Sequence, residues 1–229
     1  MELGGSAPGI VCADADLEKV LETIYFLRFS NAGQMCDGLK RLIVHESRYD
    51  EVVEKLSKLL LSKKIGDALD ESTDIGPLVS SAQLEHFEEQ YLDALGCGAK
   101  VFAEIPIPLG FEGAYATPRI LGNISPEMLI WQEEVFGPML PIVPYETIDE
   151  AIELANDTIY GLGAYVFTED TDLFRKIATS IESGMVQMNT LNYCIPESPF
   201  GGYKQSGIGR EHGKWGFHEF TKTKVMSIP

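Results

Sequence analysis

Residues 9–45, GIVCADADLEKVLETIYFLRFSNAGQMCDGLKRLIVH, carry the clearest structural pattern in the chain. The run Gly9-Ile10-Val11-Cys12 is short and apolar, which predicts a buried strand. From Asp16, whose carboxylate is suited to cap a first turn, apolar residues recur at helical spacing until the pattern stops near Asn31. The run 41–45 then predicts a second strand. Strand, helix and strand in this order are typical of an α/β domain with a largely parallel sheet.

The same alternation continues toward the C-terminus. We predict further strands over 100–102, 141–143, 163–167 and 185–188, and helices over 52–60, 84–95, 148–155 and 172–181. No internal repeat or low-complexity linker interrupts them. The expected fold is therefore a largely parallel sheet flanked by helices.

Length and composition limit the class of protein. With 229 residues, of which 45% are hydrophobic, the chain is long enough for one large domain with an appendage. A formal net charge of -17 argues against nucleic-acid binding, which relies on Lys and Arg to neutralise phosphates. No leader pattern and no apolar run of membrane-spanning length is present, so we expect a soluble protein with no membrane partner.

The cysteines and histidines suggest neither disulfides nor a metal. The four cysteines are far apart and lack Cys-x-x-Cys spacing, which favours a reducing, cytoplasmic location. The four histidines lack the spacing of metal ligands, and we assign no metal.

The last part of the chain changes character. Residues 200–210 are rich in glycine, which predicts an extended or looping surface segment. Thr221 to Ser227 alternate in polarity, which predicts a terminal strand that needs another sheet edge for pairing. We therefore divide the chain into a main domain over 1–203 and a C-terminal arm with an oligomerisation strand over 204–229.

Two residues are candidates for covalent chemistry. Cys36 follows a Gly-Gln turn just before a predicted strand, where a thiolate nucleophile could lie at the mouth of a cleft. Glu2 precedes Gly4-Gly5, which would let the backbone approach a bound group closely. Taken alone, a cysteine is more often a buried packing residue, and a terminal glutamate is more often a solvated charge.

Their combination with later segments is more specific. Five motifs occur in the order, and at the separations, found in the C-terminal half of the aldehyde dehydrogenase superfamily, which the chain therefore resembles. These are residues 1–5 (MELGG), 31–36 (NAGQMC), 133–138 (EEVFGP), 198–202 (SPFGG) and 204–207 (KQSG).

The resemblance implies a role for each matching residue. Cys36 would be the nucleophile, and Glu2 the general base that activates water. Glu134 would contact the ribose of the nicotinamide, and Phe136 would pack near the nicotinamide ring. Tyr193 and Phe200 match substrate-channel positions. The implied reaction is oxidation of an aldehyde to a carboxylic acid with NAD or NADP, through a thiohemiacetal and a thioester on the cysteine.

The chain also departs from the family pattern. Asp37 stands where a small or apolar residue is usual, and an anion there is expected to raise the pKa of the neighbouring thiol unless its side chain points away. Ser6 and the pair Lys40-Arg41 resemble succinate-semialdehyde dehydrogenases, which favours a semialdehyde substrate.

No dinucleotide-binding fingerprint is present, so the N-terminal cofactor-binding domain of the family is expected to be absent. We therefore expect a homo-oligomer, or association with a separate N-terminal cofactor-binding half. The alternative is an inactive or cofactor-independent fragment, acting as a residual thiol esterase or as an oligomerisation module.

Overall fold

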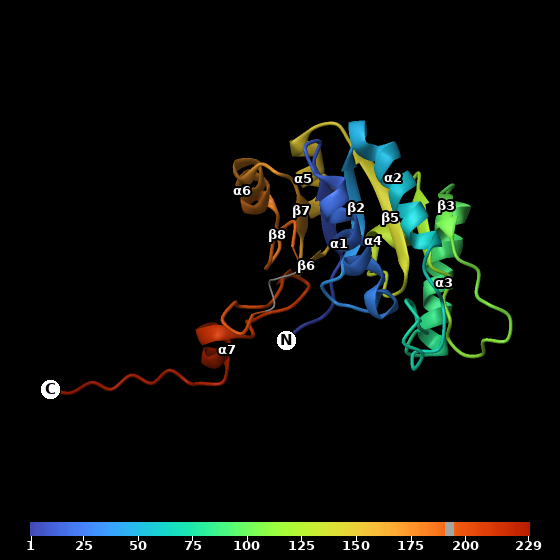
Figure 1. Ribbon diagram of the computed structural model, residues 1–229. Coiled ribbons are helices and arrows are strands. Elements are labelled where there is room, and N and C mark those ends of the chain that lie inside the picture. Colours follow the sequence, from blue (N-terminus) through green and yellow to red (C-terminus); the bar gives the residue numbers. More distant parts are fainter. Residues whose placement is uncertain (191–194) are drawn as a thin grey trace.

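A mixed, mostly parallel sheet forms the centre of the protein. The computed structural model describes residues 1–190 and 195–229. Its seven-stranded sheet has the order β3-β4-β5-β2-β1-β7-β8, with every neighbouring pair parallel except β3 and β4 (Figure 1). The strands are β1 (Ala7–Val11), β2 (Leu39–His45), β3 (Lys100–Glu104), β4 (Arg119–Gly122), β5 (Met139–Tyr145), β7 (Tyr165–Phe167) and β8 (Gln187–Met188).

Helices cover both faces of this sheet. The helices are α1 (Leu17–Phe29), α2 (Glu46–Leu61), α3 (Ser81–Gly96), α4 (Leu129–Gln132), α5 (Ile148–Asn156), α6 (Thr171–Ser180) and α7 (Gly213–Glu219). Side chains of α1, α2 and α3 join one apolar cluster, and those of α5 and α6 join a second. Consecutive strand residues alternate between the two, because Val11 belongs to the first cluster and Ile10 to the second. The central strands are therefore buried on both sides.

The predicted strands and helices up to residue 188 are confirmed, with ends that shift by a few residues. The structure adds β4, α4 and α7 and the two-residue strands β6 (Tyr160–Gly161) and β9 (Tyr203–Lys204), which the sequence pattern did not reveal. Strand β4 has four residues directly after Pro118, too few to show a period. Asp16 occupies the N-cap position of α1 as expected, but its side chain makes no capping hydrogen bond and instead pairs with Lys19 at 2.9 Å. No helix in the described parts of the chain is both long and apolar enough to cross a membrane.

The glycine-rich segment loops back onto the domain. Strand β9 (Tyr203–Lys204) within it pairs with β6 (Tyr160–Gly161) in an antiparallel ladder. Ser206 and Gly207 are buried, although we expected a surface segment throughout, because they pack against residues 1–3. Beyond α7, residues 221–229 contain no regular element, are exposed and extend away from the domain (Figure 1). The strand expected over Thr221 to Ser227 stays a prediction about an assembled state.

Candidate active site

Three segments meet at one edge of the sheet. Glu2 lies shortly before β1, Cys36 shortly before β2, and Glu134 shortly before β5. These strands are neighbours in the order β5-β2-β1 and run parallel, so the residues that precede them converge at the same edge. Gly4, two residues after Glu2, packs directly against the Glu134 carboxylate, so positions 130 residues apart in sequence are in contact here.

The loop before β2 exposes part of Cys36. After α1 the chain forms a short 3-10 segment (Ser30–Gly33), in which Asn31 and Ala32 have φ values of 51° and 53°. Gly33 has φ +75°, and a Cβ there would collide with the backbone of Gly137, so the turn requires glycine. Cys36 follows in a second turn and is half-buried. Its position at the mouth of a cleft stays a prediction.

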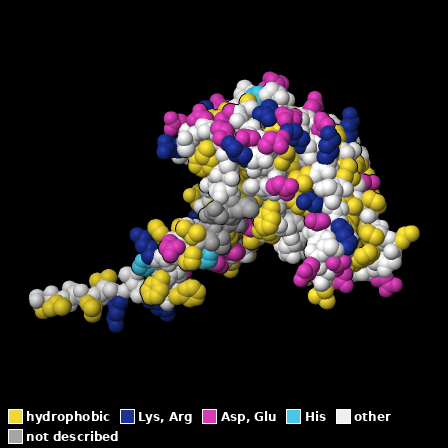
Figure 2. Space-filling view, viewed as in Figure 1, with side chains coloured by type: hydrophobic (Ala, Val, Ile, Leu, Met, Phe, Trp, Pro, Cys, Tyr) yellow, Lys and Arg dark blue, Asp and Glu magenta, His cyan; other side chains and the backbone are white. Residues whose placement is uncertain are grey.

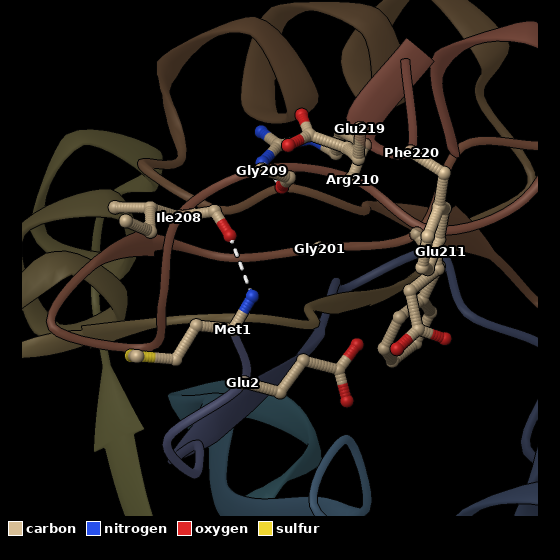
Figure 3. A pocket seen from close by; sticks show the side chains of 10 residues that line it. Met1, Glu2, Gly201, Ile208, Gly209, Arg210, Glu211, Glu219 and Phe220 are labelled. Carbon is tan, nitrogen blue, oxygen red and sulfur yellow. Dashed lines mark hydrogen bonds between the residues drawn. The ribbon is translucent and has the colours of Figure 1, made fainter. Parts of the chain in front are cut away.

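The backbone around Glu2 is fixed by the glycine-rich segment. The Leu3 amide donates to the carbonyl of Ser206 at 2.9 Å, and the amide of Ile208 donates to the carbonyl of Met1 at 3.1 Å. The amino group of Met1 in turn donates to the carbonyl of Ile208 at 2.9 Å (Figure 3). Glu2 therefore sits in a short antiparallel pairing opposite Gly207.

Glu2 lines a small pocket of about 150 Å³ together with Phe200, Arg210, Glu211 and Phe220, among others. The side chains of Glu2 and Glu211 lie on the same side of this pocket (Figure 3). Partial burial, followed by the negative charge of Glu211, raises the pKa of Glu2. A carboxylate with a raised pKa is a better proton acceptor than an ordinary surface glutamate, which suits a general base.

Asp37 points toward the candidate nucleophile. Its Oδ1 lies 3.9 Å from Sγ of Cys36, in position to accept the thiol proton. The Asp37 side chain is buried, and its Oδ2 has no hydrogen-bond partner among the described residues. The hydroxyl of Tyr165 donates to the Asp37 carbonyl at 2.9 Å and fixes this turn.

Burial and then the charge of Asp37 raise the pKa of Cys36. Glu2 raises it further, and Lys40 opposes the increase. The resting form of Cys36 at neutral pH is therefore the thiol. The side chain of Asp37 does not point away from Cys36. The aspartate that replaces the usual small or apolar residue therefore raises the pKa of the thiol directly.

Glu134 and Phe136 border a groove of about 600 Å³ with Gln83, His86 and Tyr160. Oε1 of Glu134 is buried and has no hydrogen-bond partner among the described residues. On its other side Gly4 leaves no space, because a Cβ there would lie 2.5 Å from Oε2 of Glu134. Burial raises the pKa of Glu134, and the nearby cation of Lys40 opposes the increase.

Two supporting residues were missed in the sequence. Arg28 is fully buried, and its guanidinium donates to the carbonyl groups of Met139, Val135, Gly137 and Leu39. It thus ties the loop before β5 to β2. The sequence did contain a signal for the burial of Arg28, because Arg28 lies four residues after Ile24 and therefore on the apolar side of α1. Gln83 donates to the carbonyl of Phe136 at 3.1 Å, and no sequence signal distinguished it.

The two substrate-channel candidates differ in outcome. Phe200 lines the same pocket as Glu2, and its backbone pairs with Glu211 in both directions, at 3.0 and 2.7 Å. Tyr193 lies outside the described residues. Within 1–190 and 195–229, no group of three or more His, Cys, Asp or Glu side chains is arranged to hold a metal ion.

Comparison with known proteins shows the family of the chain. The sequence model of the aldehyde dehydrogenase family matches residues 1–226. The chain belongs to the aldehyde dehydrogenase family. It is 41% identical to the chloroplastic aminoaldehyde dehydrogenase of Arabidopsis thaliana over its whole length, which covers 46% of that relative. It is 38% identical to the mitochondrial succinate-semialdehyde dehydrogenase of Oryza sativa subsp. japonica, of which it covers 43%.

Solved structures give the same family. An NAD+ complex of the aldehyde dehydrogenase from Bacillus cereus superimposes with a TM-score of 0.92 at 36% identity, over 96% of this chain and 45% of that one. This aldehyde dehydrogenase chain therefore spans about half the length of the relatives it matches. Because similar relatives are chloroplastic and mitochondrial, its cytoplasmic location stays a prediction.

Proposed function

We propose that this chain carries the covalent chemistry of an NAD(P)-dependent aldehyde dehydrogenase, with Cys36 as nucleophile and Glu2 as general base. The observation that carries the proposal is the convergence of Glu2, Cys36 and Glu134 at the amino ends of three adjacent parallel strands. This chemistry requires a thiol and a carboxylate with a raised pKa, and the groove bordered by the half-buried Glu134 lies beside them.

The residues of the chain would act in two stages. Cys36 loses its proton and its sulfur adds to the aldehyde carbon, forming a thiohemiacetal. A bound NAD or NADP supplies the acceptor for the hydride that leaves as the thiohemiacetal becomes a thioester. Glu2 then takes a proton from water, and the resulting hydroxide attacks the thioester carbon. The carbon–sulfur bond breaks, which releases the carboxylic acid and returns the Cys36 thiol.

The groove suits the nicotinamide end of the cofactor. Glu134 borders the groove, and a carboxylate is the type of acceptor that a ribose hydroxyl donor requires. The Phe136 ring lines the same groove and offers an apolar surface to a nicotinamide. We propose that Glu134 and Phe136 hold this part of NAD or NADP. The adenosine part would need a separate N-terminal half or a neighbouring subunit.

For the substrate we propose a semialdehyde, on the basis of Ser6 and the pair Lys40-Arg41. Neither basic side chain would itself bind a substrate carboxylate, because both are buried and donate to backbone carbonyls. The relatives include both aminoaldehyde and succinate-semialdehyde dehydrogenases, so these two classes are the substrates to compare.

Acylation by p-nitrophenyl acetate tests the two roles without cofactor. We expect a burst of nitrophenolate, an acetyl group on Cys36 by peptide mass spectrometry, and accumulation of this acyl form in Glu2→Gln. Cys97→Ser is the matched control, because Cys97 is an exposed cysteine away from the site. Loss of the burst in Cys97→Ser, or its persistence in Cys36→Ser, would overturn the assignment.

A second assay separates a dehydrogenase from a residual thiol esterase. The chain is supplied with NAD+ or NADP+ and either succinate semialdehyde or 4-aminobutanal, and absorbance at 340 nm is followed with and without the N-terminal half of a homologue. A dehydrogenase gives reduced cofactor in at least one combination. Ester hydrolysis without reduced cofactor in any of them would favour the esterase.

A further inference from the structure

Lys40 is a buried cation that contacts both sides of the site. Its side chain, only 1% exposed, starts from β2 and runs beneath the loop that carries Cys36. The ammonium group donates to the carbonyl of Met35, the residue directly before Cys36. It also lies 3.6 Å from Oε1 of Glu134 and 5.2 Å from the centre of the Phe136 ring.

These contacts connect two loops that have different tasks. The carbonyl of Met35 belongs to the loop of the nucleophile, whereas Glu134 and Phe136 border the groove. Oε1 of Glu134, the atom that lies near Lys40, has no hydrogen-bond partner among the described residues. The ammonium is therefore close enough to attract this carboxylate but is hydrogen-bonded to the other loop.

We propose that Lys40 is a positioning residue through which the charge state of Glu134, and hence of any group bound there, is transmitted to the thiol of Cys36. This goes beyond the proposed function, because neither the nucleophile nor the base requires such a link. It also does not depend on turnover, since the reactivity of a free thiol reports it.

The charges around the three groups favour this route. Cys36 faces the charges of Asp37, Glu2 and Lys40, and Lys40 is the cation among them that promotes the thiolate, as does the backbone amide of Asp37. Lys40 faces Arg28, Glu134, Cys36 and Asp37, and burial lowers its pKa to about 8. Glu134 opposes this decrease. The Glu134 carboxylate therefore keeps Lys40 protonated, and the protonated Lys40 favours the thiolate of Cys36.

The direction in which Glu134→Gln shifts the pKa of Cys36 distinguishes a link through Lys40 from a direct effect of the nearby Glu134 charge. Removing an anion near a thiol normally lowers the thiol pKa. If Glu134 acts through Lys40, Glu134→Gln has the opposite effect, because Lys40 loses its proton more readily. We expect the pH midpoint of Cys36 alkylation to rise by about 0.3 pH unit, which slows the reaction at pH 7.5 about twofold.

The experiment follows alkylation of Cys36 by iodoacetamide from pH 6 to 10 with peptide-resolved mass spectrometry, using Cys97 as an exposed internal reference. In Lys40→Met we expect the midpoint to rise by about 0.5 to 1 pH unit. In the Lys40→Met background, adding Glu134→Gln should no longer raise this midpoint. Lys204→Met is the matched control, since Lys204 also donates to two carbonyl groups and pairs with Glu182 at 2.7 Å.

An unchanged or lower pH midpoint of Cys36 alkylation in Glu134→Gln would overturn the proposal. A shift in Lys204→Met as large as that in Lys40→Met would also overturn it. If Lys40→Met does not fold, which circular dichroism reveals, the direction of the Glu134→Gln shift decides alone. The dehydrogenase assignment is not at stake in this test, because it rests on acylation of Cys36 and on reduction of cofactor.

Discussion

The amide of Leu3 donates to the carbonyl of Ser206 at 2.9 Å, which joins the first residues of the chain to the glycine-rich segment beside Glu2. The hydroxyl of Ser206 is buried and accepts from the amide of Gly161 at 2.9 Å. A glycine-rich loop is thus fixed to the domain at one side and to the segment of Glu2 at the other. The position of the candidate base therefore depends on residues about 200 positions later in the sequence.

Gly207→Ala tests this dependence. Gly207 has φ +144°, and a Cβ there would collide with the backbone of Met1, so alanine must displace the segment that carries Glu2. We expect hydrolysis of the acetyl-Cys36 form to slow by about tenfold to a hundredfold, because a displacement of about 1 Å has this effect on a reacting group. The rate of acetylation should change much less. Both rates come from the nitrophenolate burst and its steady state.

Gly96→Ala is the control for that substitution. Gly96 is the last residue of α3, and a Cβ there would meet no atom within 4 Å. Its hydrolysis rate should match that of the unmodified chain. Equal rates in Gly207→Ala and Gly96→Ala would show that the loop does not position Glu2.

The sequence was sufficient for six of the seven strands of the sheet but not for the contacts within the site. Strands such as β1 are apolar on both faces, and helices such as α2 have a clear period, so local patterns revealed them. The pairing of Glu2 with Gly207 and the contact of Lys40 with Glu134 join distant positions that no local pattern relates. Lys40 looked like a marker of substrate class in the sequence, and its burial became evident only from the packing.

Arg28→Met is expected to destabilise the fold strongly. The Arg28 guanidinium donates to four backbone carbonyl groups, and its loss leaves these acceptors buried without their donor. At a cost of about 1 kcal/mol for each, the free energy of unfolding should fall by about 3 to 5 kcal/mol. Urea denaturation followed by circular dichroism measures it.

Arg175→Met provides the comparison on α6. Arg175 is exposed and pairs with Asp172 at 2.9 Å, a surface contact that contributes little to stability. The urea midpoint of this variant should stay close to that of the unmodified chain. A small effect of both substitutions would mean that the carbonyl groups around Arg28 find other partners.

Asp37→Asn should make Cys36 more reactive. The pKa of Cys36 is raised by burial and then by the charge of Asp37, so removal of that charge lowers the pKa and increases the thiolate fraction at neutral pH. We expect alkylation at pH 7.5 to accelerate about threefold to tenfold, with a midpoint about 0.5 to 1 pH unit lower. Asp50→Asn, an exposed position on α2, is the control. An unchanged midpoint in Asp37→Asn would mean that Asp37 is already neutral beside the thiol.

Deletion of residues 221–229 should change the assembly without changing the stability of the domain. These residues are exposed, and Val225, Met226 and Ile228 present apolar side chains to solvent. Figure 2 shows apolar side chains along this extended tail. If Thr221 to Ser227 pair with a sheet edge of another copy, their removal lowers the mass measured by sedimentation, while the urea midpoint stays the same. In such a strand Val225 lies on the face opposite Lys222 and Lys224. Val225→Ser should then weaken association more than Lys224→Ser, and an equal mass in the full and shortened chains would exclude the strand as an oligomerisation element.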